Sequence, residues 1–168
     1  MAASLPKPGL RPCLPADTPI LAEIFRASIA ELTGEDYSEG QQEAWASAAD
    51  DEASFGRRLA GGLTLVATIA GAPVGFIALK GKDTIDLLYV HPGAARRGIA
   101  TMLCDALEQL AKARGAQTIT VDASDTAEPF FRRRGYAAHQ RNTVPLAGEW
   151  LGNTTMRKSL TGATGPDA

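Results

Sequence analysis

Cysteine is scarce in this sequence. Only Cys13 and Cys104 occur among 168 residues, and two cysteines are too few for a disulfide scaffold or a multi-cysteine zinc site. We therefore expect no bound metal. So few cysteines are typical of proteins in a reducing compartment, and we expect a cytoplasmic location.

Long hydrophobic runs are also missing. The longest unbroken apolar runs have four residues, as in 76–79, whereas a membrane-spanning helix needs about 20. Residues 1–15 contain four prolines and no continuous apolar core, which is unlike a signal peptide. We therefore expect a soluble protein that does not associate with membranes.

The composition is that of a globular domain, with 45% hydrophobic and 21% charged residues. A length of 168 residues suits one domain and is short for two. Because the chain shows no repeat and no linker, we expect a single domain over residues 1–160. A tail rich in Gly, Thr and Pro follows at 161–168, and we expect it to be disordered.

Charge is divided unevenly along the chain. Residues 1–56 contain 3 basic and 10 acidic residues, a net charge of −7, and residues 57–168 contain 14 basic and 9 acidic ones, a net charge of +5; these sum to the total of −2. One interpretation is a chance difference between solvated surfaces. The other is that the front of the chain faces a cation and the back faces an anion.

Hydrophobic periodicity divides the chain into helices and strands. It predicts helices over 17–32, 39–49, 52–59, 97–114 and 125–134, and strands over 10–14, 63–70, 74–79, 84–90, 118–121, 136–144 and 150–160. Three strands in the middle form an antiparallel meander, and a helix then leads to the next strand. This order predicts a mixed α/β sheet with one parallel crossover.

The turn between strand 84–90 and the helix after it has the features of a pyrophosphate site. Gly98 and Ala100 are small enough for a ligand to approach the backbone, and Arg96 and Arg97 add positive charge. The first turn of the helix offers free N–H groups and the positive end of the helix dipole. Neither GxxxxGK[ST] nor GxGxxG occurs, so a nucleotide-binding βα module remains only a weaker alternative.

Two correctly spaced motifs resemble those of the GNAT superfamily of acyl-CoA-dependent N-acetyltransferases. Val90, His91 and Pro92 match the V-x-P end of the family's strand, and Gly98 and Ala100 match the G-x-G/A half of its phosphate turn. A later motif, approximately N-x-x-A-x-x-F-Y-x-x-x-G-F, is matched in register by Ala127, Phe130, Gly135 and Tyr136. The resemblance extends over residues 63–160.

The resemblance implies a mostly antiparallel seven-stranded GNAT sheet with helices on both faces, splayed between its fourth and fifth strands around acetyl-CoA as cosubstrate. Backbone groups of Leu88, Tyr89 and Val90 would bind the pantetheine arm and the acetyl carbonyl. The amides of residues 96–101 would bind the pyrophosphate, and Ser124, Phe130 and Phe131 would line the thiol end. The six amides belong to Arg96, Arg97, Gly98, Ile99, Ala100 and Thr101.

Three residues depart from the family pattern. Ala95 stands where Gln or Arg is usual, and Ser124 stands where Asn is usual. Phe131 stands where many members have the Tyr that protonates the leaving thiolate, so the usual general acid is missing. We consider Tyr136 as an alternative acid, or as a packing residue, and Asp86 as a general base, or as a carboxylate that is ion-paired or faces solvent.

The acidic part of the chain, residues 1–56, which we call the front segment, contains the expected acceptor site. Tyr37 and Trp45 lie there among Glu35, Asp36, Glu39 and Glu43, and aromatic and acidic side chains together suit a cationic amine. The alternative is a solvated acidic loop that Trp45 anchors.

The sequence thus predicts direct transfer of an acetyl group from acetyl-CoA to a primary amine of a small molecule or a protein. A non-catalytic acyl-CoA-binding or sensing domain is the alternative, because position 131 lacks the Tyr. We expect no nucleic-acid partner, although Arg132, Arg133 and Arg134 form a basic run, and we expect a monomer or a homodimer.

Overall fold

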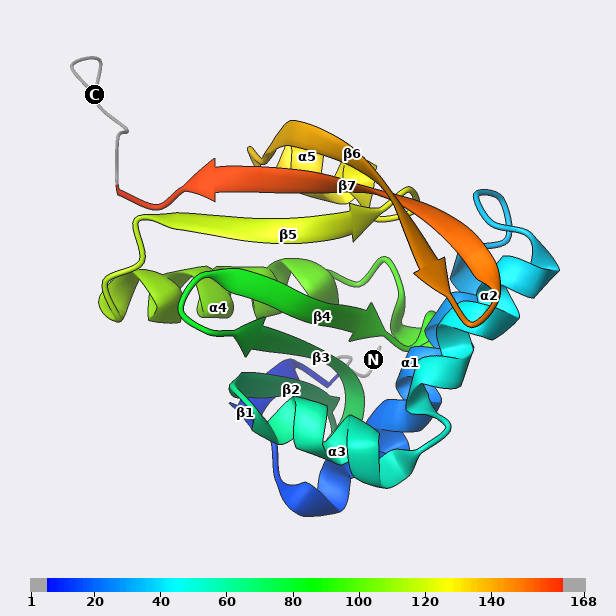
Figure 1. Cartoon of the computed structure of the whole chain (residues 1–168). Helices are drawn as coiled ribbons and strands as arrows, with labels where there is room; N and C mark the ends of the chain where they lie inside the picture. The colour runs from blue at the N-terminus through cyan, green and yellow to red at the C-terminus, as the bar shows by residue number, and fades with distance from the viewer. Residues whose placement is uncertain (1–5, 162–168) are drawn as a thin grey trace, which may run out of the picture.

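The structure is a computed structural model that describes residues 6–161. Its centre is a seven-stranded sheet with the strand order β1-β2-β3-β4-β5-β7-β6 (Figure 1). All neighbouring strands are antiparallel except β4 and β5, which are parallel. The strands are β1 (Pro8–Pro12), β2 (Leu63–Ile69), β3 (Ala72–Lys80), β4 (Thr84–Val90), β5 (Thr118–Ser124), β6 (Ala137–Leu146) and β7 (Glu149–Ser159).

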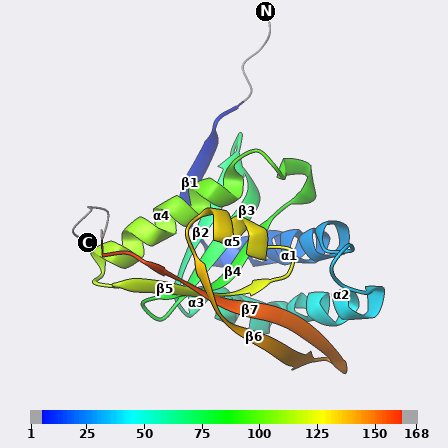
Figure 2. The same ribbon diagram turned by 90° about the horizontal axis from the view of Figure 1, so that it is seen from above.

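Helices lie on both faces of this sheet. Figure 1 shows α4 and α5 behind the sheet and α3 in front of it, and Figure 2 shows the same layers from above. The α1–α2 segment lies at the end of the sheet to which β4 and β5 point. The helices are α1 (Thr18–Leu32), α2 (Glu39–Ala46), α3 (Glu52–Ala60), α4 (Ile99–Ala113) and α5 (Glu128–Arg133).

Two apolar clusters, one on each face, hold the layers together. Helix α4 buries a stripe at helical spacing that includes Ile99, Leu103 and Leu107, and this stripe packs on the sheet together with Phe131. On the other face, Phe25 of α1 and Phe55 of α3 pack together with Phe76 of β3, among others. Helices α1 and α4 therefore bury most of the apolar face that their sequence pattern indicated, but Ile20 and Leu32 of α1 and Leu110 of α4 are exposed.

The predicted architecture is confirmed, with differences at the ends of elements. Strand 84–90 is found with the predicted bounds, whereas β5 continues to Ser124 and α5 begins only at Glu128. Helix α4 begins at Ile99 rather than at residue 97, because Gly98 has a φ of +78°, which a helix cannot include. The predicted helix over 39–49 divides into α2 and a 3-10 turn over Ser47–Ala49.

The expected disordered tail, 161–168, lies outside the described residues except for Thr161. Within residues 6–161, no helix is both long and apolar enough to cross a membrane. The same residues contain no group of three or more His, Cys, Asp or Glu side chains arranged to hold a metal ion.

Candidate active site

The sheet opens between its two parallel strands. β4 and β5 pair only at Thr84–Thr120 and Ile85–Val121, and beyond these pairs the strands diverge toward their carboxyl ends (Figure 1). A cavity of about 420 Å³ occupies this region, and we call it the central cavity. Residues 84–89 of β4 and 121–124 of β5 line it, together with side chains from the α1–α2 segment, α3, α5 and the β6–β7 hairpin.

A β-bulge in β4 determines which side chains face the cavity. Ile85 is opposite Leu79, and Leu87 is opposite Ala78, so Asp86 is an extra residue in the strand. As a result, Ile85 packs in the cluster under α4, whereas Leu87 and Tyr89 pack in the cluster under α1 and α3. The bulge thus turns Tyr89 toward the α1–α2 side of the sheet.

The turn before α4 presents unused backbone donors. Arg96 and Gly98 both have positive φ, +61° and +78°. Met102 is the first residue at this end of α4 whose N–H donates to a carbonyl of the preceding turn, that of Gly98 (3.0 Å). The N–H groups of residues 96–101 find no acceptor in the described part of the chain. Such donors, with the helix dipole and the exposed Arg96 and Arg97, suit a pyrophosphate.

The turn before α4, residues 96–101, adjoins the open end of β4, and we call it the phosphate turn. Ile99, the first residue of α4, packs so closely beside Gly75 of β3 that a Cβ there would lie 3.2 Å from its Cγ2 and 3.0 Å from the Tyr89 carbonyl oxygen. Leu88, Tyr89 and Val90 pair with β3 along one edge, and no described strand pairs with their other edge. An extended, amide-containing chain such as pantetheine fits along that edge, in line with the phosphate turn.

The predicted thiol-end residues lie on the β5 and α5 side. Ser124 and Phe131 line the central cavity, and the Ser124 hydroxyl accepts the N–H of Ala127 (3.1 Å), which shapes the turn into α5. Phe131 is only 2% exposed and supplies a hydrocarbon wall without a proton to donate. Phe130 lies outside the cavity lining, where its ring lies 5.9 Å from the Arg134 guanidinium carbon.

The two predicted acceptor residues are close to each other and to Tyr89. The Tyr37 and Trp45 rings are 5.3 Å apart at their centroids, and the Trp45 indole N–H donates to the Tyr89 hydroxyl (3.2 Å). All three side chains line the central cavity. The structure therefore brings the front segment against the end of β4.

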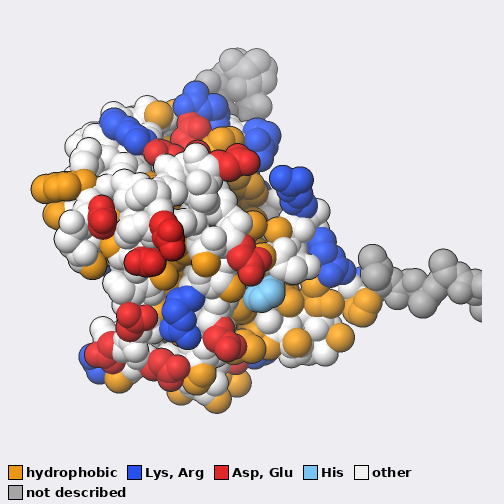
Figure 3. All heavy atoms as spheres, turned by 90° about the vertical axis from the view of Figure 1, so that its right-hand side faces the viewer, with side chains coloured by type: hydrophobic (Ala, Val, Ile, Leu, Met, Phe, Trp, Pro, Cys, Tyr) orange, Lys and Arg blue, Asp and Glu red, His pale blue; other side chains and the backbone are white. Residues whose placement is uncertain are grey.

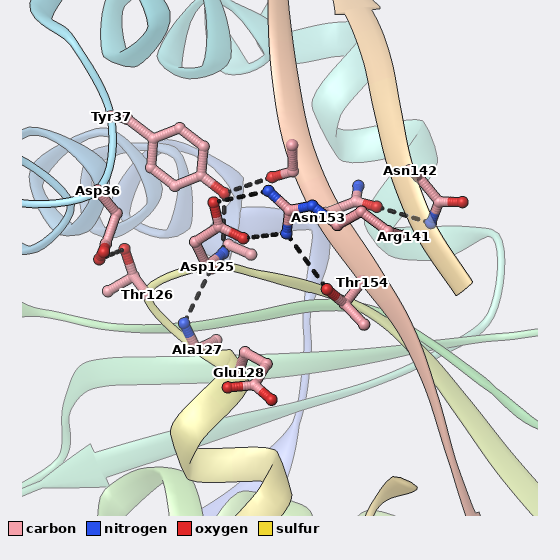
Figure 4. Close-up of polar contacts among 12 residues, drawn as sticks. Asp36, Tyr37, Asp125, Thr126, Ala127, Glu128, Arg141, Asn142, Asn153 and Thr154 are labelled. Carbon is pink, nitrogen blue, oxygen red and sulfur yellow. Dashed lines mark hydrogen bonds and ion pairs between the residues drawn. The ribbon is translucent and has the colours of Figure 1, made fainter. Parts of the chain in front are cut away.

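Tyr37 also ties the front segment to the far side of the cavity (Figure 4). Its hydroxyl donates to the Gly152 carbonyl (2.6 Å) and accepts the N–H of Asp125 (2.8 Å). Asp125 forms an ion pair with Arg141, and next to it Thr126 donates to Asp36 (2.8 Å). Burial raises the pKa of Tyr37, so the phenol stays protonated and these contacts persist near neutral pH.

The candidate base, Asp86, is ion-paired. Arg58 of α3 donates to both of its carboxylate oxygens, from Nε at 2.8 Å and from Nη2 at 3.0 Å. Both residues line the cavity. Each oxygen retains a lone pair, so the ion pair fixes the position of the carboxylate and leaves it able to accept a proton through water.

The candidate acid Tyr136 lies away from the cavity, which argues against the predicted catalytic role. It is 3% exposed, and its hydroxyl donates to Glu108 (2.8 Å) beneath α4. Burial and the neighbouring Glu108 carboxylate raise the pKa of Tyr136. Glu108 also accepts from Arg134 and Lys158, so Tyr136 belongs to a buried polar network that joins α4 to β7.

Other residues that the sequence singled out have structural positions. His91 accepts the Gly93 N–H (3.0 Å) and caps the turn after β4. Burial raises the pKa of the Cys104 thiol to about 12, as expected for an inert core cysteine. In the basic run, Arg132 pairs with Glu128, and Arg134 pairs with Asp105 and Glu108.

Sequence reasoning missed several cavity residues. Arg58, Asp122 and Asn153 line the cavity, and Arg141 supports it by pairing with Asp125. They come from elements that the sequence pattern identified, but no motif marks them. Only the tertiary structure places them at the site: α3 lies close enough to β4 for Arg58 to reach Asp86, β7 pairs with β5, and β6 pairs with β7.

Comparison with known proteins agrees with this geometry. The family model of the acetyltransferase (GNAT) domain matches residues 33–160. The chain is 38% identical over 143 residues to a protein of Escherichia coli K12 described as the uncharacterized N-acetyltransferase YafP, covering 85% of this chain and 90% of that protein.

Solved structures show the same fold. A GCN5-related N-acetyltransferase from Rhodopseudomonas palustris superposes with a TM-score of 0.90 at 62% identity, over 95% of this chain and 99% of that one. The PaiA N-acetyltransferase of Thermoplasma acidophilum, solved in complex with coenzyme A, superposes with a TM-score of 0.74 at 19% identity, over 91% and 99% of the two chains. The chain belongs to the GNAT superfamily of N-acetyltransferases and is an acyltransferase that uses acetyl-CoA as its cosubstrate.

Proposed function

We propose that this enzyme transfers the acetyl group of acetyl-CoA directly to a primary amine of a small molecule or a protein. The observation that carries the proposal is the alignment of three features. The free edge of β4 leads from the phosphate turn into the central cavity, and the opposite wall of that cavity carries the aromatic side chains of the front segment. A thioester bound along β4 would therefore be reached by an amine entering from the α1–α2 side.

The chain's own groups supply most of what the transfer needs. The amides of residues 96–101 hold the phosphates, and the backbone of residues 88–90 aligns the pantetheine arm and polarises the acetyl carbonyl. When bound, acetyl-CoA supplies the activated acyl group. Asp86, positioned by Arg58, accepts through a bridging water the proton that a protonated acceptor must lose before its amine can attack.

The acceptor is proposed to be cationic. Glu35, Glu39 and Glu43 are exposed on the same segment as Tyr37 and Trp45, and none forms an ion pair with another described residue. Figure 3 views the molecule from this end and shows acidic side chains through the middle of the face, with most basic ones toward its upper and right margins. Together with the rings of Tyr37 and Trp45, this distribution favours a polyamine or a basic peptide over a neutral amine.

The remaining features of the proposal concern the whole chain. We infer a single domain over residues 1–160 that acts in the cytoplasm as a monomer or a homodimer. The two cysteines support a reducing compartment, since both Cys13 and Cys104 are free thiols. The basic run offers little surface to nucleic acid, because Arg132 and Arg134 already pair with carboxylates.

A binding test and a turnover test examine the proposal together. Calorimetric titration should show CoA binding and no comparable binding of ATP or NAD. Mixing with acetyl-CoA and a panel of polyamines, amino acids, aminoglycosides and peptides should release free thiol, fastest with the cationic members at low salt. Tight CoA binding without amine-dependent thiol release across the panel would contradict the proposed transfer.

A further inference from the structure

Two tyrosines line the central cavity, and their hydroxyls differ in how their protons are used. Tyr37 donates its proton to the Gly152 carbonyl and accepts the Asp125 N–H. The Tyr89 hydroxyl has one contact with a described residue, in which it accepts the Trp45 indole N–H at 3.2 Å. The Tyr89 proton therefore has no partner within residues 6–161 and is available to whatever occupies the cavity.

The Tyr89 hydroxyl is also held in place. An indole N–H can only donate a hydrogen bond, so Trp45 fixes the phenol oxygen as the acceptor and directs its proton elsewhere. Ring packing restrains the phenol as well, with centroid distances of 4.6 Å to Phe25, 5.8 Å to Phe76 and 6.3 Å to Trp45. Such a hydroxyl is preorganised and loses little freedom on engaging a ligand.

We propose that Tyr89 is a catalytic residue that relays a proton from the attacking amine to the leaving sulfur. The inference rests on the proposed acetyl transfer. As the C–N bond forms and the C–S bond breaks, the electron pair of the C–S bond goes to sulfur. One N–H proton passes to the second lone pair of the Tyr89 oxygen, while the Tyr89 proton passes to sulfur. Tyrosine is neutral before and after, and the products are an amide and a free thiol.

Neutral relay suits this environment better than ionisation of the phenol. Burial raises the pKa of Tyr89 to about 12, which makes a free tyrosinate costly. A relay never accumulates that charge, because the oxygen gains one proton as it loses another. The relay also supplies the sulfur with a proton at a site where Phe131 provides no hydroxyl.

Tyr89→Phe tests the proposal because it removes the oxygen and keeps the packed ring. Positioned acid–base groups contribute about 10²–10⁴-fold, and a thiolate of pKa ~8.5 is a fair leaving group. We therefore expect the lower end, a fall in kcat of about 100-fold. Calorimetric affinity for acetyl-CoA and KM for the amine should change by less than about threefold, or under about 0.7 kcal/mol.

A proton inventory in mixed H₂O and D₂O separates a relay from a structural role. The wild type should show a curved inventory, since two protons move together, and Tyr89→Phe should lose the curvature. Trp45→Phe keeps a ring but removes the N–H group that orients the Tyr89 hydroxyl. Its kcat should therefore lie between those of the wild type and Tyr89→Phe, and the curvature of its inventory should be reduced. These shifts report on proton transfer and would not follow from altered packing.

The possible failures can be told apart. Suppose that the wild type releases thiol and that the kcat of Tyr89→Phe lies within about threefold of the wild-type value, or that the whole defect of this variant is in the KM of the amine. Either result would overturn the relay and leave the acetyl transfer standing. A wild type that releases no thiol with any amine would overturn both.

Discussion

Gly98 offers a sharp test of the phosphate turn, because the cost of substituting it can be divided into two parts. Gly98 has a φ of +78°, and a Cβ placed on it would meet no described atom within 4 Å. An alanine there suffers no clash but adopts a left-handed conformation, which costs about 1–2 kcal/mol. For a protein of this size the melting temperature should fall by about 2–4 °C per kcal/mol.

The second part is the loss of ligand binding. The open space beside Gly98 is the space that the pyrophosphate is proposed to occupy, so the added methyl group would push the phosphate away from the amides. Hydrogen bonds to a charged group contribute about 1.5–3 kcal/mol each. Loss of one should weaken CoA binding by about 10- to 100-fold, since about 1.4 kcal/mol corresponds to tenfold.

Gly115 provides the matched control. It follows the other end of α4 with a φ of +95°, and a Cβ there would also meet nothing within 4 Å. Gly115→Ala should therefore lower the melting temperature by a similar amount and leave the CoA affinity unchanged. Both variants are compared with the wild type by thermal unfolding and by calorimetric titration with CoA. Equal CoA affinity in Gly98→Ala and Gly115→Ala would refute the assignment of the phosphate turn.

Three further variants test other parts of the account. Asp86→Asn should lower kcat, because the amide cannot take up the proton of the acceptor, while the calorimetric affinity for CoA stays within about threefold; a kcat equal to that of the wild type would exclude Asp86 as the base. Glu108→Gln leaves Arg134 and Lys158 without their buried carboxylate, and chemical denaturation should show a loss of about 3 kcal/mol in the free energy of unfolding; a loss below about 1 kcal/mol would mean that the network contributes little. Tyr37→Phe removes two hydrogen bonds, so thermal unfolding should show a loss of about 1–3 kcal/mol and the KM of the amine should rise; unchanged values would show that the segment is held by other contacts.

The sequence was most informative where periodicity and glycine placement act locally. The amphipathic stripe of α4 and the glycines that end α4 and α5 predicted both helices to within a few residues. The meander over 63–90 was predicted because alternating apolar residues and turn residues specify antiparallel neighbours without help from distant contacts.

The cavity side chains were harder to predict because their directions depend on tertiary structure. Strict alternation would place Ile85, Leu87 and Tyr89 on one face of β4, but the bulge at Asp86 separates Ile85 from the other two. No local signal predicts that bulge. Likewise, the ion pair of Asp86 with Arg58 joins residues 28 positions apart, and only the packing of α3 beside β4 brings them together.

For Tyr136 the sequence left two roles open, an alternative acid and a packing residue. The ring lies under α4, where the hydroxyl donates a hydrogen bond to Glu108, so the structure favours the packing role. The sequence did not identify Glu108 as buried, because a carboxylate beside the apolar stripe of α4 only interrupts the hydrophobic pattern. Its partners Arg134 and Lys158 come from later elements, so no local pattern links them to it.

The most direct test of the central claim is a mass balance for acetyl transfer. The wild type and Gly98→Trp, which blocks the phosphate turn, are incubated with acetyl-CoA and the best amine of the panel. Acetyl-CoA consumed, free CoA formed and acetylated amine formed are then measured together by mass spectrometry. The account predicts equal amounts of all three in the wild type and none above background in Gly98→Trp. Loss of acetyl-CoA without acetylated amine, or equal turnover in Gly98→Trp, would contradict it.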